Sequence, residues 1–153
     1  MKTTSLKKLA VAVSLAGAIA LPGLAQARTL TLNTQMQSYR GDGAYLAIYV
    51  TDASGKYQST LWVAGKKTKY YKHLRDWNRG RSTDNVAFDG ITGASVGSGE
   101  NLTVTVELAD ALLDAGYEIR IDSAVEDKRD NPAEIKFPLT TKGAGQDTNG
   151  SGY

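Results

Sequence analysis

Apolar and polar side chains alternate along most of the chain, a pattern typical of β-strands that bury one face. The alternation predicts six strands, over residues 29–36, 44–51, 57–63, 102–108, 117–125 and 135–139. Glycine, aspartate and other turn-forming residues separate them. The sequence Asp-Ala-Ser-Gly at residues 52–55 predicts that the second and third strands form a hairpin.

The period of the pattern changes over residues 66–79. Tyr70, Leu74 and Trp77 stand at i, i+4 and i+7, which predicts one short helix packed against the sheet. Six strands and one helix predict an all-β fold, an antiparallel β-sandwich of immunoglobulin-like type. We expect Trp77 to cover the sheet. The strand residues expected in the core are Leu46, Ile48, Val104, Val106, Ile119 and Ile121.

The N-terminus has the pattern of a secretory signal peptide. A basic start, an apolar stretch and a small-residue cleavage site follow one another, at Lys2, Lys7 and Lys8, residues 9–21 and residues 25–27. The apolar stretch is too short to span a bilayer comfortably. We therefore expect residues 1–27 to be removed on export and the mature protein not to span a membrane. Residues 28–141 are expected to form the sandwich domain, followed by a disordered tail at residues 142–153.

Removal of the signal peptide changes the charge of the protein. The whole chain has 18 basic and 16 acidic side chains, but three lysines and no acids lie in residues 1–27. The mature chain thus carries 15 basic and 16 acidic side chains, so its charge gives no reason to expect a nucleic-acid partner. The chain has no cysteine, so its fold depends on burial of a core. A mature length of about 126 residues is typical of a single domain.

Residues 89–95 read Asp-Gly-Ile-Thr-Gly-Ala-Ser and combine an acid, small residues and a terminal hydroxyl. This loop resembles the acceptor motif of flavin transferases of the ApbE type, which attach FMN through its phosphate to a Thr or Ser of extracytoplasmic bacterial proteins. The resemblance implies that Ser95 carries FMN and that Asp89 contacts the transferase or shapes the loop. It also implies that Thr92 holds the loop and that Gly93 leaves room for the hydroxyl to enter a foreign active site. The same residues also form an ordinary glycine-rich turn between strands.

Residues 66–81 carry seven basic side chains against a single acid, with three aromatic residues between them. Export argues against an RNA partner for this segment. An anionic partner, an anionic lipid surface, or the phosphate and ring of a flavin fits the composition. The alternative is a solvated helix face whose lysine stems lie over apolar surface.

Residues for catalysis or metal binding are scarce. His73 is the only histidine, and no set of carboxylates or histidines has the spacing of a metal site. The charged turn at residues 127–131 lacks the regular alternation and the central glycine of a calcium loop. We therefore expect neither a metal site nor an enzyme.

A wider resemblance rests on residues 44–65, 69–77 and 88–95, which read AYLAIYVTDASGKYQSTLWVAG, KYYKHLRDW and FDGITGAS. These stretches are similar to a family of predicted periplasmic bacterial domains of unknown function, over about residues 29–140. Members of that family commonly have Thr at the position of Ser95 and Arg at the position of Val96. Their genes often lie near PepSY-type membrane reductases and iron-uptake receptors.

The resemblance implies a periplasmic protein with a membrane or periplasmic protein as its partner. We expect a non-enzymatic accessory or binding module of a membrane redox or iron-uptake system. The alternative is a periplasmic electron carrier with covalent FMN on Ser95, attached by a flavin transferase.

Overall fold

The computed structural model describes residues 26–81, 91–143, 145 and 147–153. The expected signal peptide lies outside the described residues, apart from its last two positions. Seven strands form within the described ranges: β1 (Ala27–Gln35), β2 (Tyr45–Thr51), β3 (Tyr57–Ala64), β4 (Thr92–Gly93), β5 (Asn101–Ala109), β6 (Glu118–Ala124) and β7 (Asn131–Pro138). The helical elements are η1 (Thr68–His73), α1 (Arg75–Gly80), η3 (Asp110–Leu112) and η4 (Thr141–Gly143).

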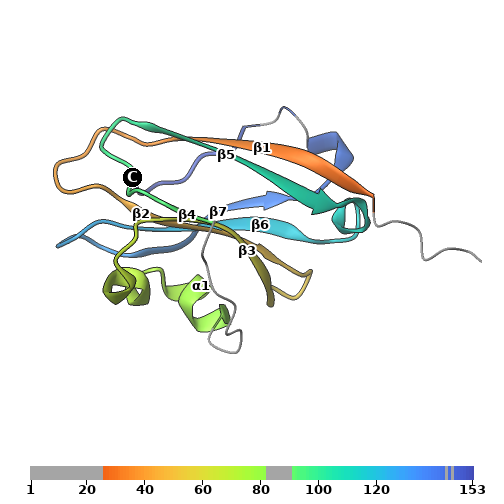
Figure 1. Cartoon of the computed structure of the whole chain (residues 1–153), viewed down its shortest axis with the longest axis horizontal. Helices are drawn as coiled ribbons and strands as arrows, with labels where there is room; N and C mark the ends of the chain where they lie inside the picture. The colour runs from red at the N-terminus through yellow and green to blue at the C-terminus, as the bar shows by residue number, and fades with distance from the viewer. Residues whose placement is uncertain (1–25, 82–90, 144, 146) are drawn as a thin grey trace, which may run out of the picture.

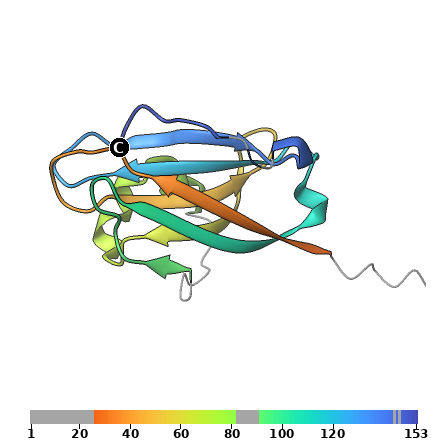
Figure 2. The same ribbon diagram turned by 90° about the horizontal axis from the view of Figure 1, so that it is seen from above.

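The elements form three layers (Figure 1). β1 and β5 pair as an antiparallel two-stranded ribbon on one side. The middle layer is a five-stranded sheet in the order β4-β3-β2-β6-β7, which Figure 2 shows from above. η1 and α1 cover the other face of this sheet (Figure 1). The fold class predicted from the sequence, an all-β sandwich, is confirmed, and the predicted hairpin is the β2–β3 pair.

The central strand β2 is buried on both faces because each face meets a different layer. Leu46, Ile48 and Val50 point into the core between the two sheets. Ala47 and Tyr49 point the other way, into a second core beneath η1 and α1. The alternation of side chains predicts one buried and one solvated face for each strand. That prediction is wrong for β2, since the helical segment shields the second face from water.

Most of the predicted core residues are buried. Leu46, Ile48, Val104, Ile119 and Ile121 expose between 0 and 8 % of their surface. Val106 is only half-buried, although Val104 and Leu108 on the same face of β5 are buried, and it pairs with Leu30 on β1.

The helical segment differs from the sequence prediction in which tyrosine it buries. Tyr71, Leu74 and Trp77 are buried, whereas Tyr70 is half-exposed. The reason is that no single helix runs through the segment: η1 ends at His73, α1 begins at Arg75, and Leu74 between them has a non-helical backbone with φ −83° and ψ 75°. The expected period of 3.6 had selected Tyr70 instead. Trp77 covers the sheet as predicted and is fully buried.

The C-terminal residues beyond η4 have no helix or strand where they are described. The ring of Tyr153 nevertheless packs edge-on against Tyr39, with ring centres 5.3 Å apart. The Tyr153 hydroxyl donates a hydrogen bond to the Arg129 carbonyl oxygen at 2.9 Å. The domain boundaries at residues 28, 141 and 142 stay predictions.

Candidate functional site

The end of the predicted acceptor loop is fixed by backbone hydrogen bonds on both sides. β4 pairs in parallel with β3, and the Gly65 N–H donates to the Gly93 carbonyl oxygen at 2.9 Å. Three residues further on, Val96 and Ala44 exchange hydrogen bonds of 2.7 and 2.9 Å. Between these two anchors Ala94 and Ser95 are exposed. The structure therefore presents a serine hydroxyl on a short loop whose two ends are tied to the same sheet. Asp89, the acid of the predicted motif, lies outside the described residues.

Two glycines leave the space that the loop needs to pack against its neighbours. A side-chain carbon on Gly93 would lie 2.6 Å from the Trp62 ring, so any larger residue at that position would have to displace this ring. A side-chain carbon on Gly43 would lie 2.5 Å from the Ser95 Oγ. Gly43 therefore leaves the space that the Ser95 side chain occupies. Thr92 forms strand β4, so it holds the loop through backbone pairing with Val63.

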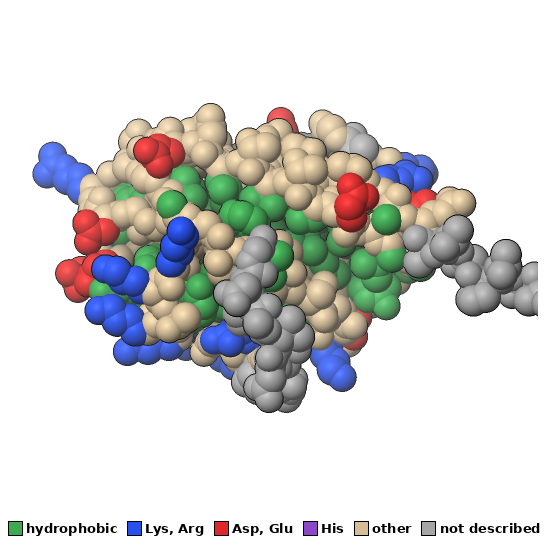
Figure 3. Space-filling view, viewed as in Figure 1, with side chains coloured by type: hydrophobic (Ala, Val, Ile, Leu, Met, Phe, Trp, Pro, Cys, Tyr) green, Lys and Arg blue, Asp and Glu red, His purple; other side chains and the backbone are tan. Residues whose placement is uncertain are grey.

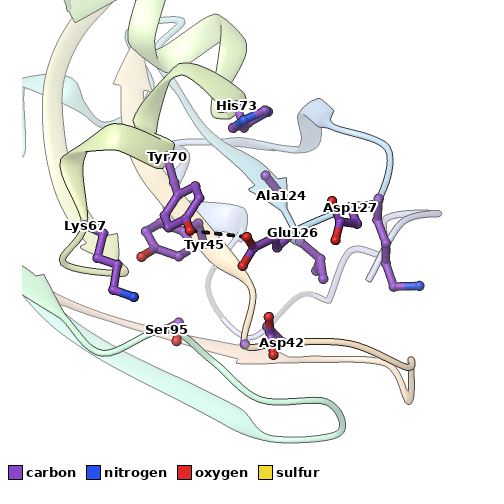
Figure 4. Close-up of a pocket in the computed structure, with 12 residues that line it drawn as sticks. Asp42, Tyr45, Lys67, Tyr70, His73, Ser95, Ala124, Glu126 and Asp127 are labelled. Atoms are coloured by element: carbon purple, nitrogen blue, oxygen red, sulfur yellow. Dashed lines mark hydrogen bonds between the residues drawn. The ribbon is translucent and has the colours of Figure 1, made fainter.

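Ser95 lines a groove of about 580 Å³. Its walls come from residues far apart in the sequence: the start of β2, η1, the acceptor loop and the turn after β6. In Figure 4, Ser95 lies at one end of the groove and His73 at the other, with Tyr45 and Tyr70 between them. The side chain of Lys67 points toward Ser95. The sequence prediction named Ser95 alone, because no local pattern indicates that these separate segments meet.

The two groove tyrosines form a fixed aromatic pair. The rings of Tyr45 and Tyr70 meet edge to face, with centres 5.3 Å apart. The Tyr45 ring lies against the backbone of Gly65, where a side chain would collide with it. The Tyr70 hydroxyl donates a long hydrogen bond of 3.3 Å to Glu126 (Figure 4). Contacts therefore hold both rings without a ligand.

The charges around the groove are of both signs. Lys67 and Lys128 bring positive charge, and Asp42, Glu126 and Asp127 bring negative charge. His73 is held by Asp130, with 3.1 Å between Nδ1 and a carboxylate oxygen. Among the residues that the structure describes, no three His, Asp or Glu side chains converge as metal ligands would.

The basic segment around η1 and α1 divides into exposed and packed side chains. Arg81 is packed, because its guanidinium lies 4.6 Å from the centre of the Trp77 ring. The exposed basic residues are Lys66, Lys67, Lys69, Lys72, Arg75 and Arg79. Lys and Arg side chains gather at the lower left of Figure 3, where η1 lies in Figure 1. One wall of the groove thus belongs to a basic surface.

A buried carboxylate attaches the helical segment to the sheet. Asp122 on β6 is fully buried. It accepts hydrogen bonds from the Tyr49 hydroxyl at 2.9 Å, the Trp77 N–H at 2.8 Å and the Ala133 N–H at 2.7 Å. Burial raises the pKa of Asp122, and these three donors act in the opposite direction. Burial also raises the pKa of Tyr49. The sequence analysis missed this residue, since an aspartate within a strand carries no mark of a partner on a distant helix.

Comparison with known proteins places the chain in a family. No curated protein and no solved structure matches it. None of the helices among the described residues is both long and apolar enough to cross a membrane. The model of one protein family matches residues 27–153, which span the whole described fold. The chain belongs to this family, whose description is predicted periplasmic protein (DUF2271).

Proposed function

We propose that this protein is a non-enzymatic periplasmic module of a membrane redox or iron-uptake system, and that it works as an electron carrier with FMN attached covalently to Ser95. The observation that carries the proposal is the presentation of the Ser95 hydroxyl. It is exposed, its loop is anchored at both ends, and it opens onto a groove lined by aromatic residues and by charges of both signs.

The geometry agrees with what an acceptor requires. A transferase must reach the hydroxyl, and the exposed Ala94–Ser95 pair beside small glycines leaves the approach open. The anchors at Gly93 and Val96 hold the loop in one position. An ordinary turn needs neither a groove beside its serine nor a clearance at Gly43. These features favour the acceptor interpretation over the plain turn.

The chemistry of attachment assigns one role to this chain, that of nucleophile. The donor is FAD, in which FMN is joined to AMP through a diphosphate. The Ser95 Oγ forms a bond to the FMN phosphorus, the phosphoanhydride bond breaks, AMP leaves, and the hydroxyl proton passes to a base of the transferase. The attached flavin supplies the electron chemistry, and the protein supplies its position.

The intact mass of the protein tests the proposal. The mature protein is produced with a flavin transferase in the periplasm, purified and weighed. We expect an added mass of one FMN less one water, absent in Ser95→Ala and retained in Ser95→Thr. Ser59→Ala is the matched control, because it removes an exposed hydroxyl on β3 that does not line the groove and should keep the added mass. Each change should alter the free energy of unfolding by about 0.5 kcal/mol or less.

An unmodified wild-type protein from cells with an active transferase would contradict the carrier function. If Ser95→Thr also stayed unmodified, the methyl group that serine lacks relative to threonine would not be the cause of the missing modification. The remaining function would be that of a binding module without a covalent cofactor, because the groove and its basic wall exist whether or not Ser95 is modified.

A further inference from the structure

We infer that the groove beside Ser95 is the seat of the flavin ring, with Tyr70 as the aromatic surface that the ring packs on and Lys67 as the cation beside the phosphate. This inference rests on the proposed attachment of FMN to Ser95. It adds that the ring does not extend freely into solvent but folds back onto the protein.

The dimensions and layout of the groove fit this role. Its volume of about 580 Å³ lies within the range of pockets that hold small molecules. In FMN a flexible sugar-alcohol chain separates the phosphate from the ring. The ring therefore lies some way from Ser95, and the surface that leads away from Ser95 carries Tyr45 and Tyr70 (Figure 4).

The Tyr70 ring is held in a position where the flavin ring can pack on it. Tyr45 meets it edge to face, Glu126 accepts from its hydroxyl, and the Lys69 ammonium lies over the ring at 4.7 Å from its centre, so its orientation is set before any ligand arrives. Tyr70 is half-exposed, whereas the next residue, Tyr71, is buried. Tyr70 is not part of the core beneath η1, and its ring faces the groove instead.

The charges favour one position for the phosphate. An FMN phosphodiester carries one negative charge. The exposed Lys67 side chain points toward Ser95, while Asp42 lies on the other side of Ser95 (Figure 4). Attraction by Lys67 and repulsion by Asp42 both place the phosphate on the side of η1. From that side the sugar-alcohol chain leads toward Tyr70.

Because the flavin is attached covalently, even a groove with low affinity for the flavin ring is occupied by it. A short flexible tether holds its end group at an effective concentration of about millimolar. A groove that binds free flavin only weakly is therefore occupied when the flavin hangs from Ser95. The groove needs no deep or closed shape to act in this way.

The test uses flavin fluorescence, which falls when a tyrosine or tryptophan ring stacks on the flavin. The flavin-loaded protein is compared with the flavin-bearing peptide released from it by protease, at equal flavin absorbance. We expect fluorescence severalfold lower in the intact protein and a severalfold recovery in Tyr70→Leu. Tyr70→Trp should restore the low value. Tyr117→Leu is the matched control, since it removes a half-buried tyrosine outside the groove and should leave the fluorescence low.

The outcomes separate this inference from the proposed function. An added mass with fluorescence equal to that of the peptide, or unchanged by Tyr70→Leu, would overturn the seat and leave the attachment standing. The absence of an added mass would overturn both. Circular dichroism of Tyr70→Leu checks that the fold is intact. If the fold is lost, Tyr70→Trp alone decides: fluorescence equal to that of its own released peptide overturns the seat, and lower fluorescence supports it.

Discussion

The carboxylate of Asp122 accepts a hydrogen bond of 2.8 Å from the backbone N–H of Trp77, a residue 45 positions earlier in the chain. Trp77 lies in the first turn of α1, where N–H groups have no partner within the helix. A side chain from the sheet therefore provides the cap that Leu74, at the N-cap position, does not supply. The bond joins the helical layer to the sheet.

Replacement of Asp122 by Asn should change how stability depends on pH. Burial raises the pKa of Asp122 in the folded protein above its ordinary value of 3.8, so the folded state holds this proton more tightly than the unfolded state does. The contribution of Asp122 to stability is then greatest below pH 3.8 and declines as the pH rises through the folded-state pKa. We expect urea unfolding to show the wild type losing stability relative to Asp122→Asn over this range. A relative gain with rising pH would mean that the three donors outweigh burial.

Truncation of a core residue should lower the free energy of unfolding by an amount that follows how deeply the residue is buried. Ile119 is 1 % exposed, and Ile119→Ala should cost about 2–5 kcal/mol in the free energy of unfolding. Val104→Ala should cost about 2 kcal/mol, and Val106→Ala clearly less, because Val106 on the same strand is half-buried. Urea denaturation of the three variants measures the order. Equal losses at Val104 and Val106 would contradict the burial of β5 described above.

Gly93→Ala should strain the acceptor loop. The new methyl group would lie 2.6 Å from the Trp62 ring, and overpacking of this kind costs about 1–3 kcal/mol. Thermal or urea unfolding measures the loss. The double variant Gly93→Ala with Trp62→Phe should recover part of it, because the smaller ring vacates the contact. Ala94→Ser, at the exposed neighbouring position, is the control and should be neutral.

Lys67→Gln should slow flavin transfer to Ser95. The incoming diphosphate is anionic, and Lys67 is the lysine whose side chain points toward the acceptor. The rate of mass gain in a purified transferase reaction measures the effect. Lys56→Gln, an exposed lysine in the β2–β3 turn, should leave the rate unchanged. At about 1 M salt, where screening acts within about 3 Å, the difference between the two variants should shrink. Equal rates for both at low salt would remove Lys67 from this role.

The mature protein should begin at Arg28. The basic start, the apolar stretch and the small residues at positions 25–27 predict cleavage after Ala27. N-terminal sequencing of the protein from the periplasm checks the position. Detection of Met1 on that protein would contradict the signal peptide.

The strands were predictable because apolar and polar side chains alternate wherever only one face of a strand is buried, as on β5 and β7. β4 escaped prediction since two residues are too few to alternate. The prediction that Tyr70 packs on the sheet is wrong, because sequence spacing does not show that the segment divides at Leu74 into two short helices. The motif predicts Ser95 as a candidate residue, whereas no sequence pattern predicts the groove around it, because Lys67, Tyr70 and Glu126 meet only after the sheet has formed.

The consecutive tyrosines of η1 have a thermodynamic consequence. Tyr71 helps dock the segment on the sheet, while Tyr70 forms a wall of the groove, so the wall exists only while the segment is docked. Local opening of η1 and α1 would remove both together, as one cooperative unit. By linkage, any ligand that occupies the groove disfavours that opening. Amide hydrogen exchange across η1 and α1 would then report occupancy of the groove, even though most of those amides never touch the ligand.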